Sequence, residues 1–238
     1  KYLKKKIFQK LFLPKTNGII THLKTMRDLY KEYMPNQNYL LARTGINNIY
    51  RENTDSKTIA YIGSLDHRKN ISDIFEAMKI INERDIKFMI IGGKTKKEIN
   101  KFNRLAKKYN LGSQVEITGW VTRKQIDKLL KDVKIGLVPL EVNFFNKYLT
   151  SPMKIFNYFS HGIPIIGTDL PTLREIVSNK RGLLYENGDY KDLADKINSL
   201  LNNNEYYEEI QENIYEFAEE VLWSKRGEKI LNFIINSN

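Results

Sequence analysis

The chain has 238 residues, of which 41% are hydrophobic and 28% are charged. This length and composition allow one or two domains with a buried core, which excludes a disordered tail or a disulfide-stapled mini-protein. The sequence contains no cysteine, so thiol catalysis, thiolate metal sites and disulfides are excluded as well. No apolar run approaches the roughly 18 residues that a membrane-spanning helix needs. We therefore expect a soluble protein of the cytoplasm.

The positive charge is concentrated at the front of the chain. The formal net charge is +11, and residues 1–50 hold ten Lys or Arg against two Asp or Glu. Residues 1–15 (KYLKKKIFQKLFLPK) place apolar side chains on one side of a predicted helix and lysines on the rest. Three interpretations remain open: a solvated helix face, a contact with the inner face of a membrane, or a nucleic-acid contact. No zinc-finger spacing or aromatic RNA-binding run supports the last, so we expect no nucleic-acid partner.

From Thr58 onward, apolar β-branched runs alternate with stretches of helical spacing. Ile71, Ile74, Phe75 and Met78 share one helical face, for example. Strand and helix in repeated alternation predict a doubly wound α/β fold, a Rossmann-like parallel sheet covered on both faces, which binds ligands beyond the carboxyl ends of its strands. The predicted strands are residues 58–63, 87–93, 114–119, 134–140, 162–168 and 182–185.

Several common signatures are missing from the sequence. It has neither the G-x-G-x-x-G dinucleotide fingerprint nor the P-loop pattern. The three histidines are scattered, and no Asp-x-Asp pair occurs, so we expect no metal ion and no bound cofactor.

The first candidate site is the segment GSLDHRKN, residues 63–70. A predicted strand ends at Gly63, and Arg68 and Lys69 follow at the start of the next predicted helix. Two cations beside the free N–H groups of a helix N-terminus suit a phosphate group. Alone this signal is weak, because a solvated turn with surface cations has the same sequence.

The second candidate site lies in residues 144–177 and is more specific. Ser151 is a suitable N-cap and Pro152 a suitable first helical residue, so a helix is predicted to begin here. Its start follows the strand 134–140. The free N–H groups of Met153 and Lys154, with the lysine charge, would then face the same crevice as the first site. Cationic loops on both sides of a crevice suit a diphosphate.

Four segments, in order, resemble a known family: GSLDHRKN, TGWV (118–121), SPMKIFNYFSHGIPIIGTDLPTLREIV (151–177) and FAEEVLWSKRGEKIL (217–231). The sequence is similar to the C-terminal, donor-binding half of GT-B retaining glycosyltransferases of family four, the glycosyl transferases group 1. The resemblance covers roughly residues 58–235. It implies a nucleotide-diphosphate sugar as substrate and transfer of its sugar to a cell-surface glycan, lipid-linked or protein acceptor.

The resemblance also implies roles for single residues. Lys69, with Arg68, would stabilise the departing diphosphate as the catalytic cations. The donor would be bound by Gly63 and Ser64 in the first turn, by Gly119 and Val121 near the nucleobase, and by Thr150, Ser151, Met153, Lys154 and Asn157.

Three positions depart from the family pattern. Ser64 stands where the family has an arginine, and Leu149 and Asn157 stand where it has two glutamates. Asn157 can still form hydrogen bonds to hydroxyl groups, whereas Leu149 cannot. A non-catalytic scaffold or regulatory relative therefore remains the alternative to an enzyme.

The resemblance divides the chain into three parts. Residues 1–50 would be the remnant and linker of an N-terminal acceptor domain that is otherwise missing, which agrees with a start at Lys1 rather than Met. Residues 51–203 would be the nucleotide-sugar-binding domain. Residues 204–238 would form C-terminal helices that pack back toward the N-terminal segment.

Overall fold

The computed structural model describes residues 16–51, 54–65, 71–81 and 85–237. The predicted helix of residues 1–15, with its proposed membrane contact, lies outside this part of the chain. Arg68 and Lys69 also lie outside it.

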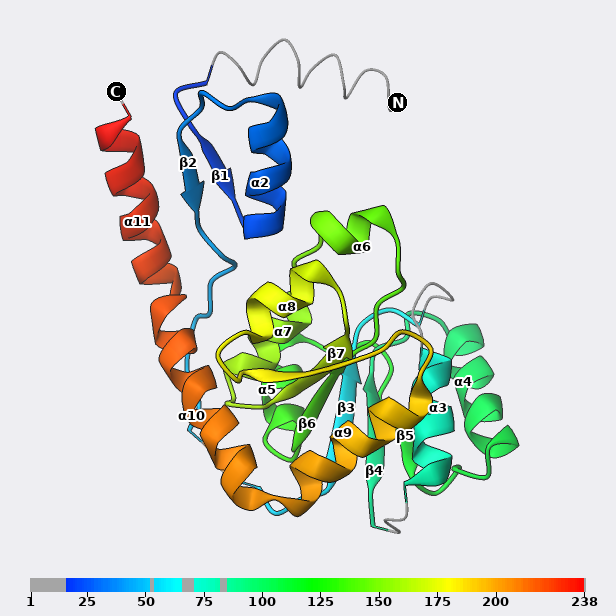
Figure 1. Ribbon diagram of the computed structural model, residues 1–238. Coiled ribbons are helices and arrows are strands. Elements are labelled where there is room, and N and C mark those ends of the chain that lie inside the picture. The colour runs from blue at the N-terminus through cyan, green and yellow to red at the C-terminus, as the bar shows by residue number, and fades with distance from the viewer. Residues whose placement is uncertain (1–15, 52–53, 66–70, 82–84, 238) are drawn as a thin grey trace.

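A parallel six-stranded sheet forms the centre of the molecule (Figure 1). Its strand order is β5-β4-β3-β6-β7-β8, so the first of these strands in the sequence lies in the middle and the sheet grows outward in both directions. This is the order of a doubly wound Rossmann-like sheet, which confirms the predicted fold class. The strands are β3 (Thr58–Ile62), β4 (Lys87–Ile91), β5 (Val115–Ile117), β6 (Ile135–Val138), β7 (Ile165–Thr168) and β8 (Gly182–Tyr185).

Helices cover both faces of this sheet (Figure 1). Helix α3 packs against α9, and α7 packs against α10. Because right-handed crossovers run in opposite directions from β3 and from β6, these two pairs lie on opposite faces. The helices are α3 (Ile71–Ile80), α4 (Lys96–Lys108), α5 (Arg123–Leu130), α6 (Phe144–Tyr148), α7 (Met153–Phe159), α8 (Pro171–Val177), α9 (Tyr190–Asn202), α10 (Asn204–Glu220) and α11 (Trp223–Asn236).

The central strands are buried on both faces. Every residue of β3, β6 and β7 is buried, which explains why their sequences are continuous apolar runs rather than alternating ones. Five of the six predicted strands are shorter than expected, and for two of them the sequence gives the reason. The strand expected over 87–93 ends at Ile91 because Gly92 and Gly93 take positive φ values of 155° and 108°. The strand expected from residue 162 begins only at Ile165, after Pro164, which has no N–H to donate to a ladder.

The described N-terminal residues form a separate small unit. Strands β1 (Ile19–Thr21) and β2 (Tyr39–Leu41) pair in parallel, and α2 (Lys24–Tyr33) connects them. Figure 1 shows α10 leading away from the large sheet and α11 lying alongside β2. The Phe233 ring of α11 lies so close to Gly18 that an added Cβ there would be 2.5 Å from the ring. Helix α11 therefore packs on the described N-terminal residues. The division of the chain into three parts stays a prediction.

Candidate functional site

The candidate site lies at the carboxyl ends of β3 and β6, the two central strands. The chain continues from β3 through α3 to β4, and from β6 through α7 to β7, so it leaves these neighbours in opposite directions. This reversal opens the crevice in which doubly wound sheets bind ligands. Both segments selected from the sequence follow these two strands.

The turn after β3 requires glycine. Gly63 has a φ of 145°, which a residue with a Cβ rarely adopts. A Cβ added here would lie 3.0 Å from Tyr61 Oη and 3.2 Å from Lys154 Nζ. The Tyr61 hydroxyl donates a hydrogen bond of 2.9 Å to the carbonyl oxygen of Ser64. Ser64 is an exposed residue. The Tyr61 hydroxyl thus holds the turn in place beside a lysine ammonium group.

The start of α7 differs by one residue from the prediction. The N-cap is Pro152, still extended with a ψ of 119°, and not Ser151, whose side chain caps nothing. The Ser151 hydroxyl oxygen is buried and makes no hydrogen bond within the described residues. A buried hydroxyl without a partner is unfavourable, so a ligand that supplies one would bind well here. Of the neighbouring residues, Thr150 is half-buried and Met153 is exposed.

Lys154 brings the two predicted segments together. Its Nζ lies 3.7 Å from the centre of the Tyr61 ring and beside the Gly63 turn. The cation therefore stands over an aromatic face, a favourable contact that also fixes its position. Because α7 begins only one residue earlier, the free N–H groups of its first turn point in the same direction. A positive charge and a helix N-terminus at one place suit an anionic ligand.

Tyr158 holds this helix against the sheet. Its hydroxyl donates to the Ala60 carbonyl oxygen at 2.8 Å and accepts from the Ile62 N–H at 3.0 Å. The side chain is fully buried, and burial raises the pKa of its hydroxyl well above the ordinary value. Since Tyr158 is four residues after Lys154, it lies on the same helix face. The anchor at β3 thereby sets the position of the lysine.

The turn predicted to meet the nucleobase lies at the start of α5. Gly119 has a φ of 73°, and Val121 is half-buried against the core. A capping box formed by Thr122 and Gln125 then starts the helix at Arg123. Its place after β5 puts the start of α5 at the carboxyl edge of the sheet, together with the other candidate residues.

Arg123 is a residue that the sequence analysis missed. Its Nη1 donates a hydrogen bond of 2.5 Å to Oδ1 of Asn157, which is 8% exposed on α7. The T-x-x-Q capping box could have indicated that this arginine stands at the ligand edge. Nothing in the sequence indicated Asn157 as its partner, since the two residues are 34 positions apart.

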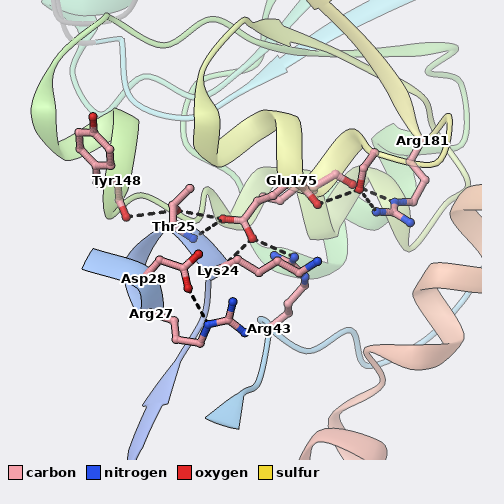
Figure 2. A network of polar contacts seen from close by, with 10 residues as sticks. Lys24, Thr25, Arg27, Asp28, Arg43, Tyr148, Glu175 and Arg181 are labelled. Atoms are coloured by element: carbon pink, nitrogen blue, oxygen red, sulfur yellow. Dashed lines mark hydrogen bonds and ion pairs between the residues drawn. The ribbon is translucent and has the colours of Figure 1, made fainter. Parts of the chain in front are cut away.

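A second polar network connects the N-terminal unit to this edge. The Glu175 carboxylate on α8 accepts hydrogen bonds from the Lys24 N–H at 2.8 Å and from the Thr25 N–H and hydroxyl at 3.2 and 2.9 Å. It also pairs with Arg43 at 3.0 Å, as Figure 2 shows. The N-cap of α2 is Leu23, which has no capping side chain. Glu175 therefore caps α2 from a distant part of the sequence.

Two negative findings concern the described residues. Among them, no three His, Cys, Asp or Glu side chains are grouped so that they could hold a metal ion. None of the helices in the described ranges is long and apolar enough to span a bilayer.

Comparisons with known proteins identify relatives of the chain. The chain is 27% identical over 227 residues to the uncharacterized glycosyltransferase MJ1178 of Methanocaldococcus jannaschii, covering 94% of this chain and 60% of the relative. It is 26% identical over 212 residues to the poly(ribitol-phosphate) alpha-N-acetylglucosaminyltransferase of Staphylococcus aureus, covering 85% of this chain and 41% of the relative. It thus spans less than two thirds of either relative.

Solved structures share the fold. A TarM mutant from S. aureus, crystallised with fondaparinux, alpha-GlcNAc-glycerol and UDP, superposes with a TM-score of 0.76 at 22% identity, over 98% of this chain and 46% of TarM. The family model described as "Glycosyl transferases group 1" matches residues 43–217. That range contains both candidate segments and more than half of the chain, and the chain therefore belongs to the glycosyl transferases group 1 family.

Proposed function

We propose that the chain is the donor-binding part of a retaining GT-B glycosyltransferase that uses a nucleotide-diphosphate sugar. The observation that carries this proposal is the contact between the Gly63 turn and Lys154 at the reversal point of the sheet. A glycine turn beside a fixed ammonium group and a helix N-terminus together suit a diphosphate.

The site would act mainly through its positive charge. When the bond between the sugar and the diphosphate breaks, negative charge accumulates on the departing nucleotide, and fixed cations stabilise it. Lys154 and the first turn of α7 would supply this charge, together with Arg68 and Lys69, which follow the Gly63 turn in the sequence. With these cations, we propose that transfer needs no metal ion or other cofactor.

The nucleotide and the acceptor are further parts of the proposal. The TarM structure was obtained with UDP, and the second curated relative is named for transferring N-acetylglucosamine. UDP-N-acetylglucosamine is therefore the donor to test first. An N-terminal half would complete the enzyme and bind a glycan, lipid-linked or protein acceptor. It would work in the cytoplasm, with the basic segment 1–15 at the inner membrane face.

A second candidate function rests on Leu149. This half-buried apolar residue stands where the resemblance implies a carboxylate that contacts the transferred sugar. A scaffold or regulatory relative would bind the nucleotide and fail to transfer the sugar. Restored transfer on adding a complete N-terminal half would exclude this candidate.

Calorimetric titration with UDP, GDP and ADP tests the donor site. We expect one of the three to bind, and Lys154→Ala to weaken it about 10- to 100-fold, because a charge-assisted hydrogen bond contributes about 1.5–3 kcal/mol. Lys128→Ala removes the same charge from an exposed position on α5 and should leave the affinity unchanged. If the wild-type chain binds none of the three, or if Lys154→Ala binds like the wild type, the proposed site is wrong.

A further inference from the structure

The polar face of α7 continues beyond Lys154. Asn157 lies three residues further on and therefore on the same face, at a rise of about 4.5 Å along the helix axis. The backbone turn at Gly63 lies beside the first of these residues. A ligand bound at the turn and extended along this face would reach Asn157 next.

The side chain of Arg123 is held in place beside Asn157. Its Nη1 donates to Asn157 Oδ1 at 2.5 Å, and its Nε donates to Asp127 Oδ1 at 3.2 Å. Two contacts in different directions restrict a side chain that would otherwise be free to turn. The arginine side chain is still 49% exposed, so part of it faces the surroundings. Its Nη2 amino group makes no hydrogen bond to any of the residues that the structure describes.

The side chains of Arg123 and Asn157 present hydrogen-bond donors to a ligand. Arg123 donates to the Asn157 side-chain oxygen, and the amide nitrogen of Asn157 is a further donor. The Asp127 oxygen that faces the arginine is likewise engaged by Nε. The Lys154 ammonium lies one helical turn away, so two cations and the one carboxylate of Asp127 leave this face positive. The ligand that matches such a face is anionic and rich in acceptor oxygens.

We propose that Arg123 is a binding residue for the ribose-phosphate part of the nucleotide, an inference that rests on the proposed donor site. Only the N-cap Thr122 separates Arg123 from the turn of residues 119–121, and Arg123 touches α7 one turn beyond the lysine that adjoins the diphosphate turn. It thus stands between the place proposed for the diphosphate and the place proposed for the base. The guanidinium group donates to oxygens of the ribose and its phosphate.

The test compares ligands that contain this part with one that does not. We expect Arg123→Gln to weaken UDP and UMP about tenfold, which corresponds to the loss of about one charge-assisted hydrogen bond. Affinity for inorganic pyrophosphate should change less than about twofold, because that ligand ends at the lysine. Lys154→Ala should show a different pattern and weaken pyrophosphate and UDP together. Lys124→Gln removes the same charge from the next, exposed residue and serves as the control.

The outcomes separate the inference from the proposed function. If wild-type protein binds UDP and Lys154→Ala weakens it, the donor site stands, and equal UDP affinities of Arg123→Gln and Lys124→Gln would overturn the role of Arg123. An equal loss for pyrophosphate and UMP in Arg123→Gln would also overturn it, since it would indicate a general charge effect. A lower melting temperature with unchanged UMP affinity would assign the arginine to helix packing alone. If GDP or ADP binds in place of UDP, that nucleotide and its monophosphate take the places of UDP and UMP in the comparison. Failure of the wild-type protein to bind any of the three would remove the inference together with the donor site.

Discussion

Replacing Glu175 with alanine is expected to lower the free energy of unfolding by about 3–5 kcal/mol, the usual cost of removing one partner from a buried ion pair. The side chains of Arg43 and Glu175 are only 10% and 9% exposed. The alanine variant would leave the arginine charge buried without its carboxylate. It would also leave the N–H groups of Lys24 and Thr25 at the start of α2 without their acceptor.

A second buried arginine, Arg181, adds to this loss of stability. Burial, with a smaller contribution from Arg43, lowers the pKa of the neighbouring Arg181 to about 10. Two guanidinium groups therefore already disfavour each other here, and Glu175 is the carboxylate that forms an ion pair with one of them. Without it, the repulsion between the two groups would no longer be offset by that pair.

Urea unfolding measures the effect, and hydrogen exchange locates it. We expect the amide protons of Lys24 and Thr25 to exchange at least tenfold faster in Glu175→Ala, because both donate to the carboxylate. Glu175→Gln keeps one carbonyl oxygen and should lose less stability. The double variant Arg43→Ala/Glu175→Ala should be more stable than the sum of the single changes predicts, since no unpaired charge remains.

A matched control removes an exposed carboxylate. Glu209 on α10 pairs with Lys180, and their side chains are 44% and 62% exposed. Glu209→Ala should leave the urea midpoint unchanged, because exposed pairs are weak. If Glu175→Ala behaves like Glu209→Ala, the cap on α2 does not hold the N-terminal unit against the sheet.

The sequence allowed the sheet and the edge of the site to be predicted. Runs such as residues 58–63 are apolar, β-branched and short, and a buried parallel strand is the structure that suits them. Since parallel strands share a carboxyl edge, the Gly63 turn and Lys154 could be expected in one crevice although 91 positions separate them. The predicted start of α7 was wrong by one residue, because a proline can serve as N-cap as well as first helical residue.

The contacts between distant side chains could not be predicted. Glu175 meets Thr25 across 150 positions, and Arg123 meets Asn157 across 34. Neither pair leaves a periodic pattern in the sequence, because each depends on how one helix lies against another. The departure at Asn157 was visible, but its consequence was not: Arg123 donates to the amide oxygen and so engages one of its two lone pairs.

Gly92→Ala is expected to damage the fold and the donor site together. The glycine follows β4 with a φ of 155°, and an added Cβ would lie 1.9 Å from the Gly63 carbonyl oxygen. The contact is with a backbone atom, which cannot rotate away as a side chain can, so the ends of β3 and β4 must separate. The hydrogen bond of 3.0 Å from Gly63 N–H to the Ile91 carbonyl oxygen would be lost.

Overpacking costs about 1–3 kcal/mol and the strained backbone about as much again, so we expect Gly92→Ala to lose about 3–5 kcal/mol of unfolding free energy. Nucleotide affinity, measured at a temperature where the variant is folded, should fall as well, because the Gly63 turn moves away from Lys154.

Two alanine controls have room for the new methyl group. In Gly112→Ala the methyl group would meet only Lys107 Cγ, at 3.9 Å. In Gly227→Ala, within helix α11, it would meet no atom within 4 Å, and this variant should gain about 0.5–1 kcal/mol of unfolding free energy. A Gly92→Ala protein as stable as Gly112→Ala would show that the two strand ends can separate freely. The site would then not depend on this close approach of their backbones.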